Sequence, residues 1–425
     1  MRVYKPSGIK WLGEIPQSWE IKPLQAIFNQ RNEQNNNLEF QTILSLVKDV
    51  GVIPYEEKGN VGNKAKDDLQ GYKIARVNDL VLNKMNAVIG SLGVSKYDGL
   101  VSPIYLVLYI ENPNYLIAYY SYLFQTKSIQ KFLRKFAYGI MEIRESIDYL
   151  EFKKMFLPTP PLQEQKEIAE FLDSKCEKIQ NYIDKKQKLI TLLQEKKQAL
   201  INEVVTKGLN PNIEFKNSGI AYLGLIPHHW EVKKLKYVGK VVLGKMLCNE
   251  HQKGYSHCYY LKSKNLQWLN VEVSQIEKMW FSEYEKSLYR IKKDDLLVSE
   301  GGEVGKTCIW NNELAECYIQ NSVHKITLNK FNNAKFFLYL FFTYGKLGVF
   351  DSVVSRVSIA HLVLEKLVNV DMVVPPLQEQ KQIANFLDEK CEKINSAIEK
   401  TKRQIALIKE YKNTLINEAV CGRIR

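Results

Sequence analysis

The fold is decided by the segment Pro160-Pro161-Leu162-Gln163-Glu164-Gln165-Lys166, which returns 215 residues later as Pro375-Pro376-Leu377-Gln378-Glu379-Gln380-Lys381. The two copies go on matching without a gap as far as Leu200-Ile201-Asn202-Glu203 and Leu415-Ile416-Asn417-Glu418. A second repeat, Gly-Ile-x-Trp/Tyr-Leu-Gly-x-Ile-Pro-x-x-Trp-Glu, begins at Gly8 and again at Gly219. Self-similarity at a long fixed period indicates an architecture of repeated units. The 425 residues are therefore one design used twice.

Each copy of the repeated segment carries apolar residues at alternating spacings of four and three, which is the heptad pattern of a long helix that pairs with another helix. Proline pairs at 160–161 and 375–376 suit helix starts, and Gly208 with Pro211 marks the first helix end. We expect the helices, residues 159–209 and 374–425, to pair antiparallel, which closes a pseudo-twofold inside one chain. The alternative is two separate amphipathic helices, each packed on its own domain. The predicted seam consists of Leu172, Ile179, Ile183, Ile190, Leu193, Leu387, Ile394, Ile398, Ile405 and Ile408.

The remaining segments, residues 1–158 and 210–373, have the length of ordinary domains. Both mix short β-rich runs with helical stretches, so we predict mixed α+β domains that alternate with the long helices and are separated by them. Asp79-Leu80-Val81-Leu82-Asn83 in the first domain parallels Asp295-Leu296-Leu297-Val298-Ser299 in the second. The predicted strands are residues 42–47, 79–82, 101–109, 296–299 and 323–328, and the predicted helices are residues 115–136 and 334–350.

The charge balance of the chain indicates its class of binding partner rather than its fold. With 60 Lys and Arg against 47 Asp and Glu, the net charge of +13 favours nucleic acid, an acidic protein or an anionic membrane surface. No apolar run approaches the roughly 18 residues that cross a bilayer, so no membrane span is expected. Seven scattered cysteines form no disulfide framework, and the N-terminal residues lack the pattern of a secretory leader. We therefore expect reduced thiols and a cytoplasmic protein.

Three short motifs suggest chemistry that the sequence does not support. The glycine stretch at 301–307 lacks the four-residue gap of a phosphate-binding P-loop, and Glu300 would oppose a phosphate. Asn112-Pro113-Asn114-Tyr115 resembles an amino-methyltransferase motif, but a helix-opening turn is the better interpretation. The set Cys248, His251, His257 and Cys258 is too loosely spaced for a metal site. No catalytic, cofactor-binding or metal-binding residues are predicted.

Basic residues mix with polar and aromatic ones around the glycine turns of both domains. Lysine and arginine bind phosphates, while asparagine, arginine and lysine also read base edges. Arg144 and Arg356 occupy the same local pattern, Arg-x-Ser-Ile-x-x-Leu, in the two halves. The alternative for each residue is a solvated loop at a strand end. The candidate DNA-binding residues are Asn83, Lys84, Asn86, Lys96, Tyr97, Arg144, Lys245, Lys306 and Arg356.

On these repeats, the sequence resembles the specificity subunit of type I restriction–modification systems over essentially its whole length. The most specific pieces are the two Pro-Pro-Leu-Gln-Glu-Gln-Lys segments, the opening repeat, and Asn83-Lys84-Met85 with Tyr97-Asp98-Gly99-Leu100-Val101-Ser102-Pro103. The second domain lacks the Asn-Lys-Met triplet. In that family, two target-recognition domains alternate with two long helices that pair antiparallel.

The resemblance implies a non-catalytic subunit that binds double-stranded DNA, each domain reading one half of an asymmetric bipartite site. The helices would set the spacer length and dock two methyltransferase subunits, which bring S-adenosylmethionine, with adenine as the expected target. Restriction–translocase subunits would bring ATP and magnesium. A different class of protein, a coiled-coil scaffold that binds proteins and not specific DNA, predicts no steep salt dependence of DNA binding. A self-sufficient enzyme would need the catalytic motif that was not found.

Overall fold

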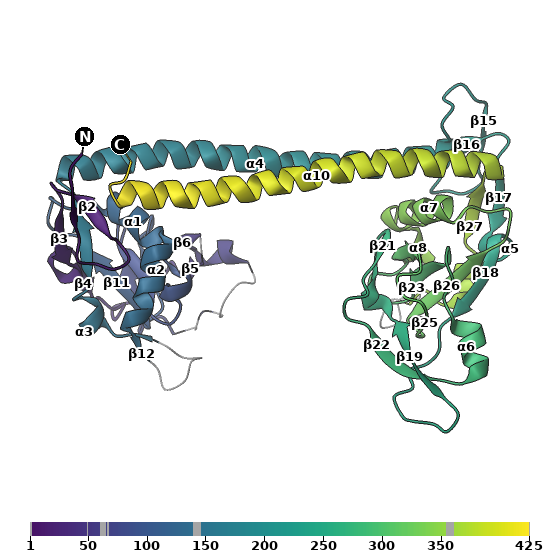
Figure 1. Ribbon diagram of the computed structural model, residues 1–425, viewed down its shortest axis with the longest axis horizontal. Helices are drawn as coiled ribbons and strands as arrows, with labels where there is room; N and C mark the ends of the chain where they lie inside the picture. Colours follow the sequence, from purple (N-terminus) through teal and green to yellow (C-terminus); the bar gives the residue numbers. More distant parts are fainter. Residues whose placement is uncertain are drawn as a thin grey trace. The chain divides into compact units, whose positions relative to one another are not determined.

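The computed structural model describes residues 2–48, 50–59, 65, 68–138, 146–353 and 361–424. The chain folds into two compact units. Unit 1 comprises residues 1–187 and 402–425, and unit 2 comprises residues 188–401. Each unit therefore combines one globular region with the adjoining stretches of both long helices (Figure 1).

The central sheet of unit 1 is antiparallel, with strand order β4-β11-β8-β9. Leu80, Leu82, Leu106 and Leu108 of the two middle strands are almost wholly buried, so the sheet is part of the core. Asp79, directly before β8, is also buried and receives two hydrogen bonds from Arg31, from Nε at 2.7 Å and Nη2 at 3.2 Å. The strands are β4 (Asn29–Arg31), β8 (Leu80–Asn83), β9 (Leu92–Val94) and β11 (Tyr105–Tyr109).

Smaller pairs of strands surround this sheet, and all of them are antiparallel. The pairs are β1 (Tyr4–Pro6) with β2 (Glu14–Pro16), β3 (Glu20–Pro23) with β14 (Phe156–Thr159), β5 (Leu44–Val47) with β6 (Gly51–Pro54), β7 (Lys73–Ala75) with β10 (Gly99–Val101), and β12 (Ala137–Tyr138) with β13 (Ser146–Ile147). The strand predicted at 42–47 is thus β5. The continuous strand predicted at 101–109 is wrong, because Pro103 cannot donate to a ladder and the chain turns there between β10 and β11.

The helical region of unit 1 is also more divided than predicted. The stretch 115–136 forms α1 (Ile117–Gln125), α2 (Lys127–Leu133) and the 3-10 turn η4 (Arg134–Phe136). The break falls at Thr126, which has extended backbone angles and accepts a hydrogen bond from Ile129 N, as threonine does at a helix start. The other helical segments are α3 (Tyr149–Phe152) and the 3-10 turns η1 (Leu24–Ala26), η2 (Tyr55–Lys58) and η3 (Ala87–Ile89).

Unit 2 repeats the central sheet with the order β18-β26-β23-β24. Strands predicted at 296–299 and 323–328 are β23 (Leu296–Ser299) and β26 (Val323–Leu328), flanked by β18 (Gly239–Leu243) and β24 (Thr307–Ile309). A second sheet has the order β22-β19-β25, from β19 (Ser256–Leu261), β22 (Glu277–Phe281) and β25 (Tyr318–Ile319). The remaining pairs are β15 (Phe215–Asn217) with β16 (Leu225–Pro227), β17 (Glu231–Lys234) with β27 (Asp371–Val374), and β20 (Leu266–Gln267) with β21 (Asn270–Val271).

The core of unit 2 lies between its central sheet and α7 (Ala334–Lys346), whose residues 336–344 are all buried. The predicted helix at 334–350 ends earlier than expected, because Gly348 adopts a φ of 70° that closes the helix, and α8 (Val349–Val353) follows. The other helical segments of the unit are α5 (Leu235–Val238), α6 (Glu283–Tyr289), α9 (Leu364–Val368) and the 3-10 turn η5 (Ser263–Asn265).

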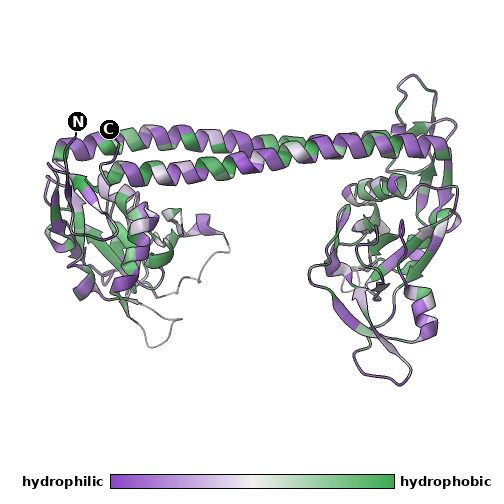
Figure 2. Cartoon of the chain, in the orientation of Figure 1, coloured by the Kyte–Doolittle hydropathy of each residue, from purple (hydrophilic) through white to green (hydrophobic). Residues whose placement is uncertain are grey.

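The two long helices are α4 (Leu162–Lys207) and α10 (Leu377–Val420), and both start directly after a proline pair. Every predicted seam residue is buried or half-buried, and apolar positions alternate with polar ones along both helices in Figure 2. In unit 2, Gly208 at the end of α4 lies against Glu379 at the start of α10. In unit 1, Gly422 at the end of α10 lies against Trp19, whose Nε1 donates to Glu164 at the start of α4. Within each unit the pairing is therefore antiparallel, and separate helices are excluded.

The predicted fold class, mixed α+β domains alternating with long helices, is confirmed. No helix in the described ranges is both long enough and apolar enough to cross a membrane. The seven cysteines are free thiols. Cys176 and Cys391 occupy equivalent buried seam positions, where burial raises the pKa of each thiol.

Candidate nucleic-acid interface

Most of the candidate residues lie near one end of a central sheet, where a hairpin turn joins two strands. This end of the sheet is called the turn edge. In unit 1 this turn edge is where β8 ends and β9 and β11 begin, since Asn83 pairs with Tyr105 and Leu82 with Leu92. In unit 2 the equivalent turn edge is where β23 ends and β24 and β26 begin, since Ser299 pairs with Val323 and Val298 with Thr307. The matching strand orders make the two edges structural equivalents.

The turn edge of unit 1 displays amide and amine groups. Asn83 is the last residue of β8, and its Oδ1 accepts a hydrogen bond from Met85 N at 3.1 Å, which leaves its amide donors. Asn86 precedes η3, and its side chain is exposed. Lys84 lies between them and is half-buried. The turn closes at Gly90 with a φ of 97°, a conformation that favours glycine.

A second lysine that sequence reasoning missed lies beside Lys84. Lys73 of β7 donates through Nζ to Tyr105 O at 2.8 Å. Burial lowers the pKa of Lys73, and the charge of Lys84 lowers it further. Within the described ranges neither amine forms an ion pair with a carboxylate. Two neighbouring cations without counterions favour an anionic partner. Nothing in the sequence around Lys73 indicated this placement, because it depends on how β7 packs next to β11.

Lys96 and Tyr97 do not join this group. They follow β9 at its far end, where Ser95 N donates to Asp79 O at 2.8 Å, beside the start of β8. Both side chains are exposed. The sheet therefore places them at the edge opposite to Asn83, Lys84 and Asn86.

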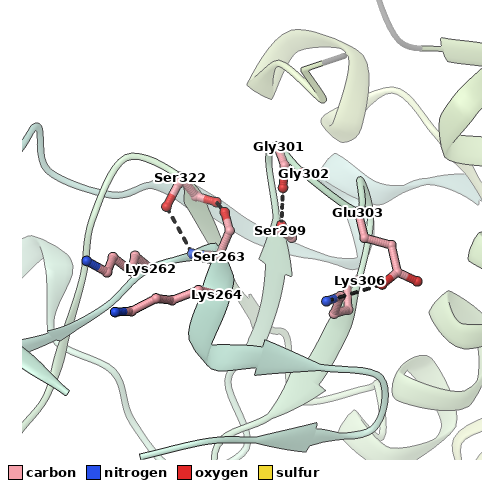
Figure 3. A pocket seen from close by; sticks show the side chains of 9 residues that line it. All are labelled: Lys262, Ser263, Lys264, Ser299, Gly301, Gly302, Glu303, Lys306 and Ser322. Atoms are coloured by element: carbon pink, nitrogen blue, oxygen red, sulfur yellow. Dashed lines mark hydrogen bonds and ion pairs between the residues drawn. The ribbon is translucent and has the colours of Figure 1, made fainter. Parts of the chain in front are cut away.

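The turn edge of unit 2 contains a pocket of about 440 Å³. Figure 3 shows Lys262 and Lys264 on one side of Ser299, and Glu303 and Lys306 on the other. Ser322 is hydrogen-bonded to the Ser263 side of the pocket. Its Oγ accepts a hydrogen bond from Ser263 N at 3.0 Å, and its carbonyl oxygen accepts one from Ser263 Oγ at 2.8 Å. Lysine, serine and glycine residues thus line one space, although the amines of Lys262 and Lys264 extend away from Ser299 in Figure 3. Residues of these types suit contact with a phosphate or a base edge. The lining residues are Lys262, Ser263, Lys264, Ser299, Gly301, Gly302, Glu303, Lys306 and Ser322.

The lysines of this pocket are already paired with carboxylates. Glu277 of β22 accepts from Lys262 Nζ at 2.6 Å, Lys264 Nζ at 3.0 Å and Tyr260 OH at 3.0 Å. The hydrogen bonds from Lys262, Lys264 and Tyr260 lower the pKa of Glu277 to about 2, so it stays ionised. Lys306 Nζ lies 3.2 Å from Glu303 Oε2. The positive electrostatic potential at this edge is consequently weaker than at the turn edge of unit 1, where the lysines have no carboxylate partner.

Lys245 also lies at the turn edge of unit 2, but its amine is occupied. It follows β18, and its carbonyl accepts from Asn321 N at 2.8 Å. Its Nζ pairs with Glu285 and lies over the rings of Tyr255 and Phe281. This lysine holds its loop in place. Arg144 and Arg356 lie outside the described residues.

The motifs set aside in the sequence have ordinary structural roles. The glycine stretch at 301–306 is the hairpin turn between β23 and β24. Asn112 starts the turn before α1, accepting from Tyr115 N at 3.1 Å, which confirms the predicted helix-opening turn. His251 and His257 both contact the ring of Trp280, with centroids 4.6 and 4.7 Å away.

Comparison with known proteins finds one family that matches both halves of the chain. The family model described as the type I restriction modification DNA specificity domain matches residues 16–194 and again residues 227–407. A putative type I restriction enzyme MjaX specificity subunit from Methanocaldococcus jannaschii is 26% identical, over 100% of this chain and 98% of the relative. The MjaVIII specificity subunit from the same organism is 25% identical, over 66% of this chain and 64% of the relative.

Solved structures share the fold. One is a chain from a structure that describes complex assembly and conformational transition of the type I R-M system. It superimposes with a TM-score of 0.73 at 15% identity, covering 96% of this chain and 99% of that chain. The HsdS subunit from Thermoanaerobacter tengcongensis gives a TM-score of 0.53 at 15% identity, covering 96% and 98%.

Proposed function

Because this chain belongs to the type I restriction modification DNA specificity family, we propose that each of its two units reads one half of a bipartite DNA site. A role in DNA sequence specificity follows from the family itself, and a protein-binding scaffold without specific DNA binding is not favoured. The proposal concerns how the specificity is divided between the units and which groups make contact.

One observation supports the assignment of one half-site to each unit. The two central sheets have the same strand order and end in equivalent turn edges, yet the side chains at those edges differ. Unit 1 offers asparagine amides and two lysines without counterions, whereas unit 2 offers serine hydroxyls and lysines held by Glu277 and Glu303. Base edges are distinguished by their pattern of donors and acceptors. Different edges should therefore select different half-sites, and the full site should be asymmetric.

The long helices are proposed to set the spacer between the half-sites. A continuous helix advances about 1.5 Å per residue, so its length converts directly into a distance along DNA. Paired seams resist bending, which supports a fixed separation. Adding one heptad to both helices keeps the seam in register and should lengthen the unread spacer without altering the bases that are read.

The chain is proposed to make no bond itself and to act with DNA and partner subunits. Two methyltransferase subunits docked along the helices would bring S-adenosylmethionine and act on a flipped adenine. Restriction–translocase subunits would bring ATP and magnesium. The support for partner subunits is the specificity role of the family. The support for DNA contact also includes the turn edges, where amines, amides and hydroxyls are suited to hydrogen bonding.

The deciding experiment maps methylated bases in DNA from cells that express this chain with its methyltransferase partner. The same map is then made with residues 1–158 exchanged for the first domain of another family member. One half-site should change and the other should stay. If both halves change together, the assignment of one half-site to each unit is wrong.

A further inference from the structure

Unit 1 contains a cavity of about 850 Å³ that runs along β9, and Gly90 and Leu92 of the turn edge line one end of it. Its walls come from β6 and β9, from the start of α2, and from stretches of α4 and α10 that belong to unit 1. Ser128 Oγ of α2 donates to Asn417 Oδ1 of α10 at 3.2 Å, which joins the globular region to the helix beside the cavity. In Figure 1 the C-terminal part of α10 passes close to α2.

The charge in this cavity is unbalanced. Lys96, Lys127, Lys409 and Lys412 line it, and among the described lining residues none is Asp or Glu. Lys127 Nζ donates to Gln130 Oε1 at 3.2 Å. The amines of Lys96, Lys409 and Lys412 form no ion pair with any carboxylate in the described ranges. The pocket at the turn edge of unit 2 differs, because each of its lysines is bound to a glutamate. Lysine amines gathered around one concave space without counterions favour the binding of an anionic ligand.

Neutral groups in the same cavity suit the rest of a nucleotide. Asn413 and Gln180 line it and offer amide donors and acceptors, although Gln180 Nε2 already donates to Asp184 Oδ1 at 2.9 Å. Ile183 and Leu92 add buried apolar surface against which a base can pack. Ligand cavities generally range from about 300 to 1,000 Å³. This volume accommodates a nucleotide with its phosphates.

We propose that this cavity binds the phosphate groups of a nucleotide, with Lys96, Lys409 and Lys412 as the contacts. The phosphates come either from a free nucleotide or from a nucleotide within DNA, because both present the same groups to the lysines. The cavity reaches the turn edge at Gly90 and Leu92, but its proposed phosphate contacts are on α10 and at the far end of β9. They are therefore different residues from the ones proposed to read bases, and the two proposals can be tested separately.

The test uses the full chain with Lys409→Gln and Lys412→Gln combined. The matched control combines Lys178→Gln and Lys185→Gln, two exposed lysines of α4 that do not line the cavity. Both double variants lose two positive charges, so a general loss of charge affects them equally. Binding of ATP and of inorganic triphosphate is measured by calorimetry, and binding of a non-specific duplex is measured at several salt concentrations. Thermal unfolding verifies that both variants fold.

Three outcomes are distinguishable. Free nucleotide binding that weakens at least tenfold only in the cavity variant supports the site with a soluble ligand. Without free nucleotide binding, a salt dependence of duplex binding that falls by about two charges more in the cavity variant than in the control supports the site with DNA as the source. Equal behaviour of the two variants in both measurements overturns the proposal. Lys84→Gln at the turn edge should leave ATP binding unchanged, which separates this site from base reading.

Discussion

Gln165 accepts a hydrogen bond through Oε1 from the backbone N of Leu116 at 2.7 Å, and so joins the start of α4 to the start of α1. Its Nε2 donates to Pro160 O at 2.8 Å. Gln380 repeats both contacts in unit 2, with Asn333 N at 2.8 Å and Pro375 O at 2.8 Å. Both side chains are fully buried. The glutamine of the repeated segment therefore fixes each long helix on its own domain.

Replacing Gln165 with leucine should destabilise unit 1 by about 1–3 kcal/mol, because buried backbone groups lose their partners. Gln163→Ala is the control, since Gln163 is exposed on the same helical turn and bonds only to Glu167 among its described contacts. Chemical denaturation of the full chain measures both changes. Equal stability of the two variants would show that the buried amide contributes nothing.

The helix seam should be sensitive to residue volume on one face of α4 alone. Ile190 is 4% exposed and Leu192 is 51% exposed, although they are two positions apart. Ile190→Ala should cost about 2–5 kcal/mol through lost packing and a residual cavity. Leu192→Ala should cost less than about 0.5 kcal/mol. Thermal unfolding of the two variants decides between a paired seam and a helix without a partner on that face, for which the two costs would be alike.

The two turn edges should respond differently to the loss of a lysine. Lys84→Gln removes a cation without a counterion, so the slope of DNA affinity against salt should fall by about 0.9, the value for one phosphate contact. Lys306→Gln should change the slope less, because Glu303 already balances that charge at 3.2 Å. Duplex binding by the full chain over a range of salt concentrations measures both slopes. A larger change for Lys306→Gln would contradict the electrostatic difference between the edges.

Acid should weaken unit 2 through His324. This residue is fully buried in β26, its Nε2 donates to Leu362 O at 2.6 Å, and its Nδ1 lacks a partner in the described ranges. Burial lowers its pKa below the ordinary value of 6.5, and the bond to Leu362 opposes that shift only partly. Below pH 6.5 the unfolded chain binds a proton that the folded chain does not, so stability falls as the pH drops from 6.5 towards the folded pKa.

His324→Gln tests this dependence, because the glutamine amide can still donate to Leu362 O but does not titrate. Unfolding free energies are compared between about pH 7.5 and about pH 5, on either side of the ordinary histidine pKa. The natural chain should lose more stability over that range than the variant. Parallel curves for the two chains would rule out His324 as the source.

A local pattern in the sequence indicated that the two domains correspond. The segments that begin at Asp79 and Asp295 are parallel in the sequence, and in the structure both aspartates are buried and occupy equivalent positions before β8 and β23. The sequence places Lys84 and Lys96 close together, but the hairpin between β8 and β9 puts them at opposite ends of the sheet. Lys73, Lys262 and Lys264 were not predicted at all. Each reaches its edge from a strand or turn that is distant in sequence, so no local signal marks it.

The sequence by itself determined the duplicated design, the two long helices with their seam, and the mixed α+β character of the domains. These features depend on periodicity and on exact repetition, which are properties of neighbouring residues. Only the tertiary structure decided which charges meet. It placed Lys73 beside Lys84, bound Lys262 and Lys264 to Glu277, and left Lys409 and Lys412 without counterions around a cavity. The energy of a charge depends on its distance to other charges and to water, and both distances are set by packing between segments far apart in the chain.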